Sequence, residues 1–164
     1  MYIHLLCTQL NKMSKFDFST SFGRLLGMTH YRMTRHLAQL MESAELPLTP
    51  EQFRFMAQLW HADDRIQQDL AHCLNRDRAN ITRITDILER KGLLSRVQDE
   101  QDRRVSKVQL TANGRVLEKP ASACAMETIA VATAGIDPKA LETCKQVLRQ
   151  VIQNLSEARD IPKK

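Results

Sequence analysis

The sequence predicts a mostly helical protein with one small β-hairpin, on three observations. Its 164 residues include five glycines and five prolines, fewer turn residues than a barrel or sandwich of this length normally uses. Hydrophobic residues recur at three- and four-residue spacings along most of the chain, which is typical of amphipathic helices. Only residues 94–110 change to short segments with β-branched side chains. The length suits one domain, and a hydrophobic content of 43% can fill a core.

The first two helices are predicted from apolar spacing and from a capping motif. Over residues 18–41 the spacing indicates one long amphipathic helix. A second helix starts after Thr49, which can act as its cap, with Pro50 in the first helical position and Gln52 completing a capping box. It is expected to end at an acidic break over residues 61–64. The apolar positions of the first helix are Phe22, Leu25, Leu26, Met33, Leu37, Leu40 and Met41.

A helix-turn-helix is predicted next. Residues 66–74 have apolar groups placed for a short helix with one buried side, and residues 78–91 form a second helix. Asp77 is a suitable N-cap for the second helix, and Gly92 is a suitable C-terminal stop. Because only a brief polar turn separates the two helices, they fit the helix-turn-helix arrangement.

The second of these helices has the chemistry of a DNA reader. An α-helix fits the major groove, where Arg binds guanine O6 and N7, Asn pairs with adenine, and Thr contacts phosphate or the thymine methyl group. The first turn and a half, which reaches the base edges in helix-turn-helix proteins, is rich in such groups. An ordinary solvated helix face is the alternative, and this helix taken alone favours that alternative. The candidate DNA contacts are Arg78, Asn80, Thr82 and Arg83.

Residues 94–97 and 105–110 are predicted to form the strands of a hairpin with a polar, charged tip, with a plain loop as the alternative. A thin β-ribbon that carries Arg103 and Arg104 can insert a guanidinium into the minor groove, where the negative potential is concentrated. Asp102 would orient an arginine through a charge-assisted hydrogen bond. The alternative for each of these charges is a turn that simply stays hydrated.

Two more helices are predicted at the C-terminal end. Thr111 can cap a helix that runs to about Ala134. Asp137 and Pro138 can start the last helix, as its cap and its first residue. An apolar stripe on this last helix needs a partner surface, because a lone terminal helix cannot leave it in water. The stripe comprises Leu141, Cys144, Val147, Leu148, Val151, Ile152 and Leu155.

Charge and hydropathy narrow the class of protein. The formal net charge is +5, yet residues 63–107, which hold the candidate DNA contacts, carry ten basic and nine acidic side chains. Placement of the arginines, rather than net charge, therefore indicates nucleic acid. No apolar run approaches the roughly 18 residues of a membrane span, and residues 1–15 lack the features of a signal peptide. We expect a cytoplasmic protein that does not associate with a membrane.

The cysteines and the known catalytic motifs argue against metal, disulfide and enzyme chemistry. Cys7, Cys73, Cys124 and Cys144 lie far apart with no C-x-x-C pair, which favours reduced thiols. The sequence has no nucleophile elbow, Gly-rich phosphate loop or H-E-x-x-H motif, and its histidines have no clear metal-ligand spacing. We therefore expect no enzymatic activity, no metal and no cofactor.

Two segments resemble the recognition helix and the wing of the MarR family of bacterial winged-helix regulators. They read RANITRITDILERKGLLSR from Arg78 and DEQDRRVSKVQLTANG from Asp99. The most specific pattern is the triplet at 102–104, followed by Leu110-Thr111 and Gly114. The resemblance covers roughly residues 20–155.

The resemblance implies a homodimer with two winged helix-turn-helix lobes that read a pseudo-palindrome in double-stranded DNA. The expected organisation is an N-terminal dimerisation segment over 1–48, the DNA-binding lobe over 49–110, and C-terminal dimerisation helices over 111–164, with the terminal helices interlocked. In the family, the arginine that matches Arg104 enters the minor groove and the aspartate that matches Asp102 braces it. Arg83 matches a frequent recognition-helix arginine.

The resemblance also implies a repressor that a small phenolic or aromatic acid releases from DNA. The ligand would bind between the dimerisation helices and the lobe. The alternative is favoured by the residue types there, since methionines and aromatic residues at helical spacing usually belong to a core. A redox-responsive regulator is one alternative, but the sensing cysteine of the family's peroxide-sensing branch would fall near Leu25, well away from Cys7. Cys73 matches a buried helix-turn-helix position, and Cys124 and Cys144 lie on the dimerisation helices. An interaction module without specific DNA binding is the other alternative. The candidate ligand-pocket residues are Met28, His30, Tyr31, Phe55, Leu59 and Trp60.

Overall fold

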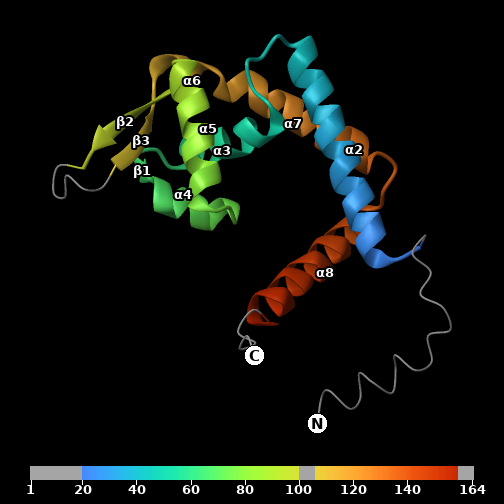
Figure 1. Ribbon diagram of the computed structural model, residues 1–164. Helices are drawn as coiled ribbons and strands as arrows, with labels where there is room; N and C mark the ends of the chain where they lie inside the picture. The colour runs from blue at the N-terminus through green and yellow to red at the C-terminus, as the bar shows by residue number, and fades with distance from the viewer. Residues whose placement is uncertain (1–19, 100–105, 159–164) are drawn as a thin grey trace. The chain divides into compact units, whose positions relative to one another are not determined.

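The computed structural model describes residues 20–99 and 106–158 (Figure 1). The described chain is mostly helical with one small antiparallel sheet, as the sequence predicts. It divides into two compact units after Ala125, and each unit is treated separately below. None of the described helices is both long enough and apolar enough to cross a membrane.

The described part of the first unit begins with α2 (Phe22–Ser43) and α3 (Pro50–His61). Helix α2 starts four residues later than the apolar spacing indicates, because the Ser21 side chain caps it by accepting a hydrogen bond from the backbone N–H of Arg24. At the start of α3 the predicted capping box is present. Thr49 Oγ1 accepts from the Gln52 N–H and Gln52 Oε1 accepts from the Thr49 N–H, each at 3.2 Å.

The predicted helix-turn-helix is formed by α4 (Gln67–Leu74) and α5 (Arg78–Arg90). Helix α4 ends at Asn75, which takes the left-handed conformation with φ of 50°. Helix α5 begins at Asp77, whose Oδ1 accepts from the Asn80 N–H at 2.7 Å. Gly92, with φ of 68°, follows the end of α5, as its sequence position predicts.

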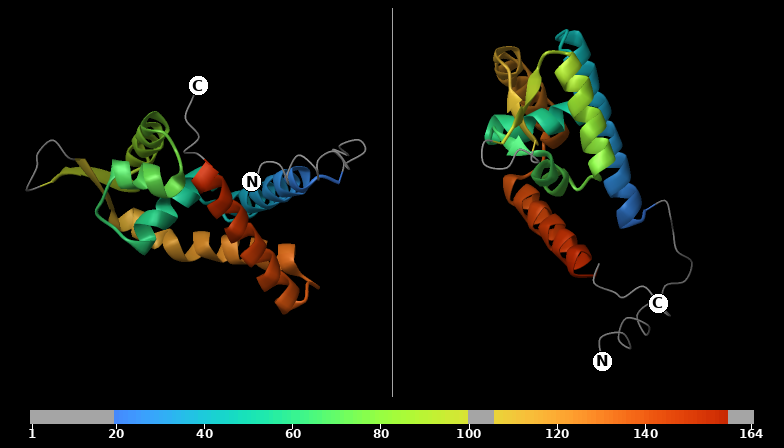
Figure 2. Two further views of the ribbon diagram at one scale, coloured as in Figure 1. Left: turned by 90° about the horizontal axis from the view of Figure 1, so that it is seen from below. Right: turned by 60° about the vertical axis from the view of Figure 1, so that its left-hand side comes forward.

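The sheet contains a third strand that the sequence analysis missed. Strands β2 (Leu94–Gln98) and β3 (Ser106–Leu110) form the predicted antiparallel hairpin, and Figure 2 shows them extending away from the helices. Strand β1 (Arg65–Ile66) pairs with the other edge of β3, which gives the order β1-β3-β2. The assignment of Ile66 to a helix was therefore wrong. A strand of two residues is too short to show the alternation of apolar and polar side chains that predicts a strand. Its partner β3 also lies about forty residues further along the chain.

The core of the first unit gathers side chains from every one of these helices and from the sheet. Phe55, Leu70 and Ile81 are completely buried, as are Leu88 and Val108. A buried hydroxyl would be costly without a partner, and Thr85 Oγ1 has one because it donates to the Ile81 carbonyl at 2.8 Å. This core fixes α5 to the body through one face only, which leaves the opposite face open.

The helix predicted from Thr111 to about Ala134 is in fact two helices, α6 (Ala112–Val116) and α7 (Glu118–Thr133). Pro120 explains the break, since it lacks an N–H and its ring would clash with the carbonyl of the residue four before it, Val116. Gly114 in α6 lies so close to β2 that a Cβ atom there would come within 2.0 Å of the Leu93 carbonyl oxygen. Only glycine permits this approach.

The second unit contains the C-terminal half of α7 and the helix α8 (Pro138–Glu157). The predicted start of α8 is confirmed, because Asp137 Oδ2 accepts from the Ala140 N–H at 2.9 Å and Pro138 is the first helical residue. Helix α8 has no buried residue, although its apolar stripe is present. Val147, Ile152 and Leu155 are each at least half exposed.

Candidate nucleic-acid interface

Helix α5 presents its polar residues on one face and its apolar residues on the other. Ile81 and Ile84 lie in the core, whereas Arg78, Thr82 and Arg83 are exposed. The helix packs against α4 on one side and β2 on the other. Its exposed face therefore lies between the start of α4 and the strands of the wing, as a helix that enters a groove of DNA requires.

A polar cleft of about 640 Å³ opens beside this face. It carries two guanidinium groups, two carboxamides and two hydroxyls, and none of the described residues lines it with a carboxylate. The N-cap of α4, Ile66, makes no side-chain capping bond, so the first N–H groups of α4 lack a side-chain cap beside the cleft. Such a site attracts anions. The lining residues are Ile66, Gln67, Gln68, Arg78, Thr82, Arg96 and Ser106.

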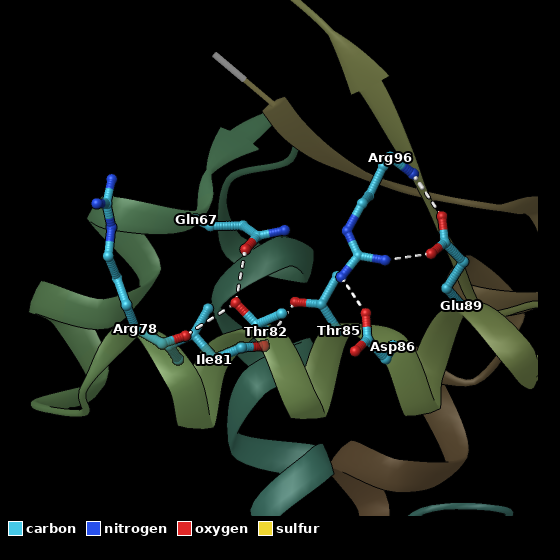
Figure 3. A network of polar contacts seen from close by, with 8 residues as sticks. All are labelled: Gln67, Arg78, Ile81, Thr82, Thr85, Asp86, Glu89 and Arg96. Atoms are coloured by element: carbon cyan, nitrogen blue, oxygen red, sulfur yellow. Dashed lines mark hydrogen bonds and ion pairs between the residues drawn. The ribbon is translucent and has the colours of Figure 1, made fainter. Parts of the chain in front are cut away.

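Thr82 and Asn80 differ in how they are presented. Thr82 Oγ1 donates to the Arg78 carbonyl at 3.0 Å and lies 3.5 Å from Gln67 Oε1, which links α5 to the start of α4 (Figure 3). Asn80 Oδ1 is buried and has no hydrogen-bond partner among the described residues. A DNA contact through the Asn80 carboxamide would require its side chain to turn outward.

Arg83 is tied to another helix. Its Nη2 lies 3.1 Å from Glu51 Oε2, in the first turn of α3, while 55% of its side chain stays exposed. The ion pair orients the guanidinium without burying it. Sequence spacing could not have indicated this pair, because the two residues are 32 positions apart.

Arg96 is a functional candidate that the sequence analysis missed. It projects from β2 onto α5, where its guanidinium donates to Asp86 Oδ1 and Glu89 Oε2 (Figure 3). Glu89 Oε1 also accepts from the Arg96 backbone N–H at 3.1 Å. The only sequence signal was a pair of carboxylates three residues apart on α5, and such a pair is common on solvated helices.

The acidic break between α3 and α4 anchors the base of the wing. Lys107 Nζ lies 2.6 Å from Asp99 Oδ2 and 3.4 Å from Asp64 Oδ2, and Gln109 Nε2 donates to Asp64 Oδ1 at 2.8 Å. Asp63 Oδ1 accepts from the Leu110 N–H at 2.9 Å. The sequence pattern of these residues indicates only a helix boundary and gives no sign that they support the wing.

The same contacts set the ionisation of the anchor. The hydrogen bond from Gln109, together with Lys107, lowers the pKa of Asp64 below its ordinary 3.8. The hydrogen bonds to Asp99 and Asp64 raise the pKa of Lys107 above its ordinary 10.5. Both groups are therefore charged throughout the neutral range.

The candidate residues of the wing tip, Asp102, Arg103 and Arg104, lie outside the described residues. Their contacts with DNA remain predictions that rest on the sequence. The strands on either side of the tip end at Gln98 and begin again at Ser106.

The proposed ligand-pocket residues occupy different environments. Phe55 and Leu59 are completely buried in the core, as the core alternative expects, and their role in a ligand pocket stays a prediction. Trp60 is half-buried, and its Nε1–H donates to the Gly114 carbonyl at 3.0 Å. On α2, His30 is exposed, as are Met28 and Tyr31, with exposed fractions of 40% and 63%.

The cysteines also differ from expectation in one case. Cys73 was expected to be buried but is exposed, because Leu70 and Ala71 fill the inner face of α4. Arg65 Nη2 donates to its sulfur at 3.2 Å. Cys124 is buried and Cys144 is exposed, while Cys7 lies outside the described residues.

Comparison with known proteins identifies the lobe that carries this interface. Residues 48–106 match the MarR family. The uncharacterized HTH-type transcriptional regulator YdgJ of Bacillus subtilis (strain 168) is 37% identical over 68 residues, which are 42% of this chain and 42% of that protein. The matched segment thus spans less than half of that relative's length.

Two solved structures extend the likeness beyond the matched segment. One comes from work on the regulation of DNA binding of Bordetella bronchiseptica BpsR by 6-hydroxynicotinic acid. Its TM-score is 0.77 at 24% identity, over 84% of this chain and 97% of that one. The other is the S. aureus MepR–DNA complex, with a TM-score of 0.75 at 23% identity, over 85% of this chain and 99% of that one. At these identities the structures establish a common fold.

Proposed function

We propose, from the premise that this chain is a winged-helix transcriptional regulator of the MarR family, that it binds a pseudo-palindromic operator as a homodimer and represses transcription. A small aromatic acid would release it from DNA. In this proposal α5 enters the major groove and the wing reaches the adjacent minor groove.

The proposal rests on one observation: some cations of the lobe pair with carboxylates, whereas Arg78 faces an open cleft. Lys107 and Arg96 pair with carboxylates and hold the wing, whereas Arg78 lines an open polar cleft on the exposed face of α5. Arg78 therefore lies at the start of the helix proposed to enter the major groove, where its guanidinium can meet DNA. This pattern supports selective binding to DNA over general attraction of polyanions.

Dimerisation is supported by the second unit. A helix of 20 residues with an apolar stripe and no buried residue is expected to bury that stripe against another chain. A two-fold dimer would place its two lobes on half-sites about one helical turn apart, which explains why the proposed operator is a pseudo-palindrome.

The similarity to BpsR supports the proposal that a small acid releases this protein from DNA. The BpsR structure comes from work on regulation of DNA binding by 6-hydroxynicotinic acid, and the MepR structure contains DNA. By analogy, the same fold in this chain would couple a ligand to its affinity for DNA. Since Phe55 and Leu59 are core residues here, the ligand would have to enter elsewhere or open this packing.

The test is selection of genomic fragments by the wild-type protein, followed by measurement of dissociation constants for the selected operator and for random DNA. Arg78→Ala and Arg104→Ala should each weaken operator binding by about tenfold to a hundredfold, since removal of one specific arginine contact costs roughly 1–3 kcal/mol. The melting temperature should stay unchanged, because Arg78 is exposed.

The matched control is Arg149→Ala, which removes the same charge from α8 in the other unit. It should leave operator affinity unchanged. If the wild-type protein binds no genomic fragment better than random DNA at physiological salt, the proposed function is wrong.

A further inference from the structure

Arg96 joins the wing to the recognition helix at one point. Its guanidinium donates to Asp86 and Glu89, which lie three residues apart on α5, and its backbone N–H donates to Glu89 as well. Only 27% of its side chain is exposed. Three hydrogen bonds, two of them between charged groups, therefore hold one residue of β2 against one turn of α5.

The charge balance at this point is unfavourable for a DNA contact. One guanidinium faces two carboxylates, so Arg96, Asp86 and Glu89 together carry a net negative charge. Arg96 lines the cleft beside Arg78, but its donors are directed to α5. A phosphate that approached Arg96 would have to displace a carboxylate and would meet repulsion from the other.

The contacts of Arg96 lie at positions on β2 and α5 where they can hold the wing without covering the start of α5. Asp86 and Glu89 lie C-terminal to Arg78 and Arg83, so the bond leaves the DNA-facing start of α5 free. In β2, Arg96 is opposite Val108 of β3, one residue along from the pair that Val97 makes with Lys107. The link on α5 and the Lys107–Asp64 link on the other side of the sheet thus hold the two strands of the wing.

We infer that Arg96 is a positioning residue, which fixes the angle between the wing and α5 so that both can enter their grooves at once. This inference rests on the proposed function. With the link intact, binding of α5 brings the wing to the minor groove without further loss of orientational freedom, as for two binding modules on a short rigid connection. Without the link, α5 still binds and the wing contact is lost.

The first test uses the free protein and needs no operator. Amide hydrogen exchange is compared between wild type, Arg96→Gln and the matched control Arg149→Gln, which also removes an arginine paired with a carboxylate. Exchange in β2 and β3 should become faster in Arg96→Gln alone, while the amides of Ile84 and Leu88 in α5 keep their protection. Unchanged exchange in both strands overturns the inference, whether or not the protein binds DNA.

The second test measures operator affinity against salt concentration. Arg96→Gln should weaken binding by about tenfold and should lower the salt slope only by as much as loss of the wing cations does in the double variant Arg103→Gln/Arg104→Gln, because Arg96 itself contacts no phosphate. Minor-groove protection should disappear from the footprint while major-groove protection persists. If Arg96 instead neutralised a phosphate in each subunit, adding Arg96→Gln to the Arg103→Gln/Arg104→Gln variant would lower the slope by about a further 0.9 for each contact, and the inference would be wrong.

The variant Asp86→Asn also distinguishes a positioning role of Arg96 from direct binding of phosphate. It can be used even if Arg96→Gln does not fold. It removes one carboxylate and leaves the guanidinium in place, so a positioning role predicts weaker operator binding. A direct role in binding phosphate predicts tighter binding, because the cation is freed. Arg96→Lys should rescue part of the affinity, since a lysine keeps the charge but cannot bridge two carboxylates with a planar fork.

Discussion

At the scale of single residues, the proposed function predicts that Glu51 competes with DNA for the guanidinium of Arg83. The guanidinium of Arg83 is 3.1 Å from the carboxylate of Glu51, yet more than half of its side chain is exposed. An exposed pair of this kind contributes little to stability, typically 0–1 kcal/mol. Its larger effect is on charge, because Arg83 is partly neutralised until DNA offers a better acceptor.

Glu51→Gln should therefore increase affinity for random DNA more than affinity for the operator. Freeing Arg83 adds a cation that can bind any phosphate, so the dependence of random-DNA affinity on salt should steepen by up to about 0.9 for each new contact. Fluorescence anisotropy with random and operator duplexes over a range of salt concentrations measures both quantities.

The control for this prediction is Glu42→Gln, which removes the same charge from an exposed position near the end of α2. An equal gain in random-DNA affinity for Glu42→Gln would mean that only net charge matters. In a background of Arg83→Gln, the effect of Glu51→Gln should vanish, since the double-mutant cycle then has no pair left to break.

At the scale of elements, the wing is attached to the helices on two sides. Arg96 fastens β2 to α5, and Lys107 with Gln109 fastens β3 to Asp64, in the loop after α3. Trp60 adds a third link, from α3 to α6, through its hydrogen bond to Gly114.

The attachment through Asp64 predicts a defined pH dependence. Because the folded pKa of Asp64 is lowered, its contribution to stability is present above the ordinary value of 3.8 and is lost as pH falls through the folded pKa. The raised pKa of Lys107 works in the opposite direction, so its contribution is lost only as pH rises above 10.5. Between these limits the attachment should be independent of pH.

The measurement is the difference in free energy of unfolding between wild type and Asp64→Asn as a function of pH. The wild-type advantage should be constant from about pH 5 to pH 9 and shrink as the carboxylate is protonated below the ordinary pKa. A difference that changes near pH 7 would show that another group governs the attachment. Glu142→Gln is a matched control on α8, where Arg149 and Lys145 lower the pKa of Glu142 in the same way.

At the scale of the whole molecule, the apolar stripe of α8 predicts the oligomeric state. Leu148 and Val151 are half-buried, while Val147 and Ile152 are exposed. Leu148→Glu or Val151→Glu should produce a monomer or a poorly folded chain, because a buried unpaired carboxylate costs several kcal/mol at an interface. Sedimentation equilibrium and the melting temperature distinguish the two results.

Gln150→Glu is the control, since it introduces the same charge at an exposed position of α8 between those two residues. An unaffected dimer in Leu148→Glu would show that α8 is not the interface. Loss of operator binding in the monomer, with the lobe still folded, would support the proposal that two lobes must bind together.

Much of the fold could be predicted because its signals are local. The capping box at Thr49 and the caps at Asp77 and Asp137 act over three residues, and each was confirmed at its predicted position. The burial of Ile81 and Ile84 follows from helical periodicity in the same way. The exposure of Arg78 and Arg83 on the opposite face could therefore be predicted before any tertiary contact was known.

The parts that could not be predicted depend on contacts between distant residues. Strand β1 exists only because β3 pairs with it, and the split between α6 and α7 requires Pro120 to be weighed against an otherwise continuous pattern. The burial of Phe55 and the exposure of Cys73 depend on which surface a neighbouring element covers, and apolar spacing does not tell this.

The sequence by itself determined the helices, their ends and the face of α5 that is left polar, since caps and periodicity operate within one or two turns. Only the tertiary structure decided which carboxylate each cation pairs with. Arg83, Arg96 and Lys107 are all cations near the candidate interface, and each pairs with a carboxylate from another element. The separation of two residues along the sequence does not predict such pairs, because an electrostatic contact depends on where folding places the two groups in space.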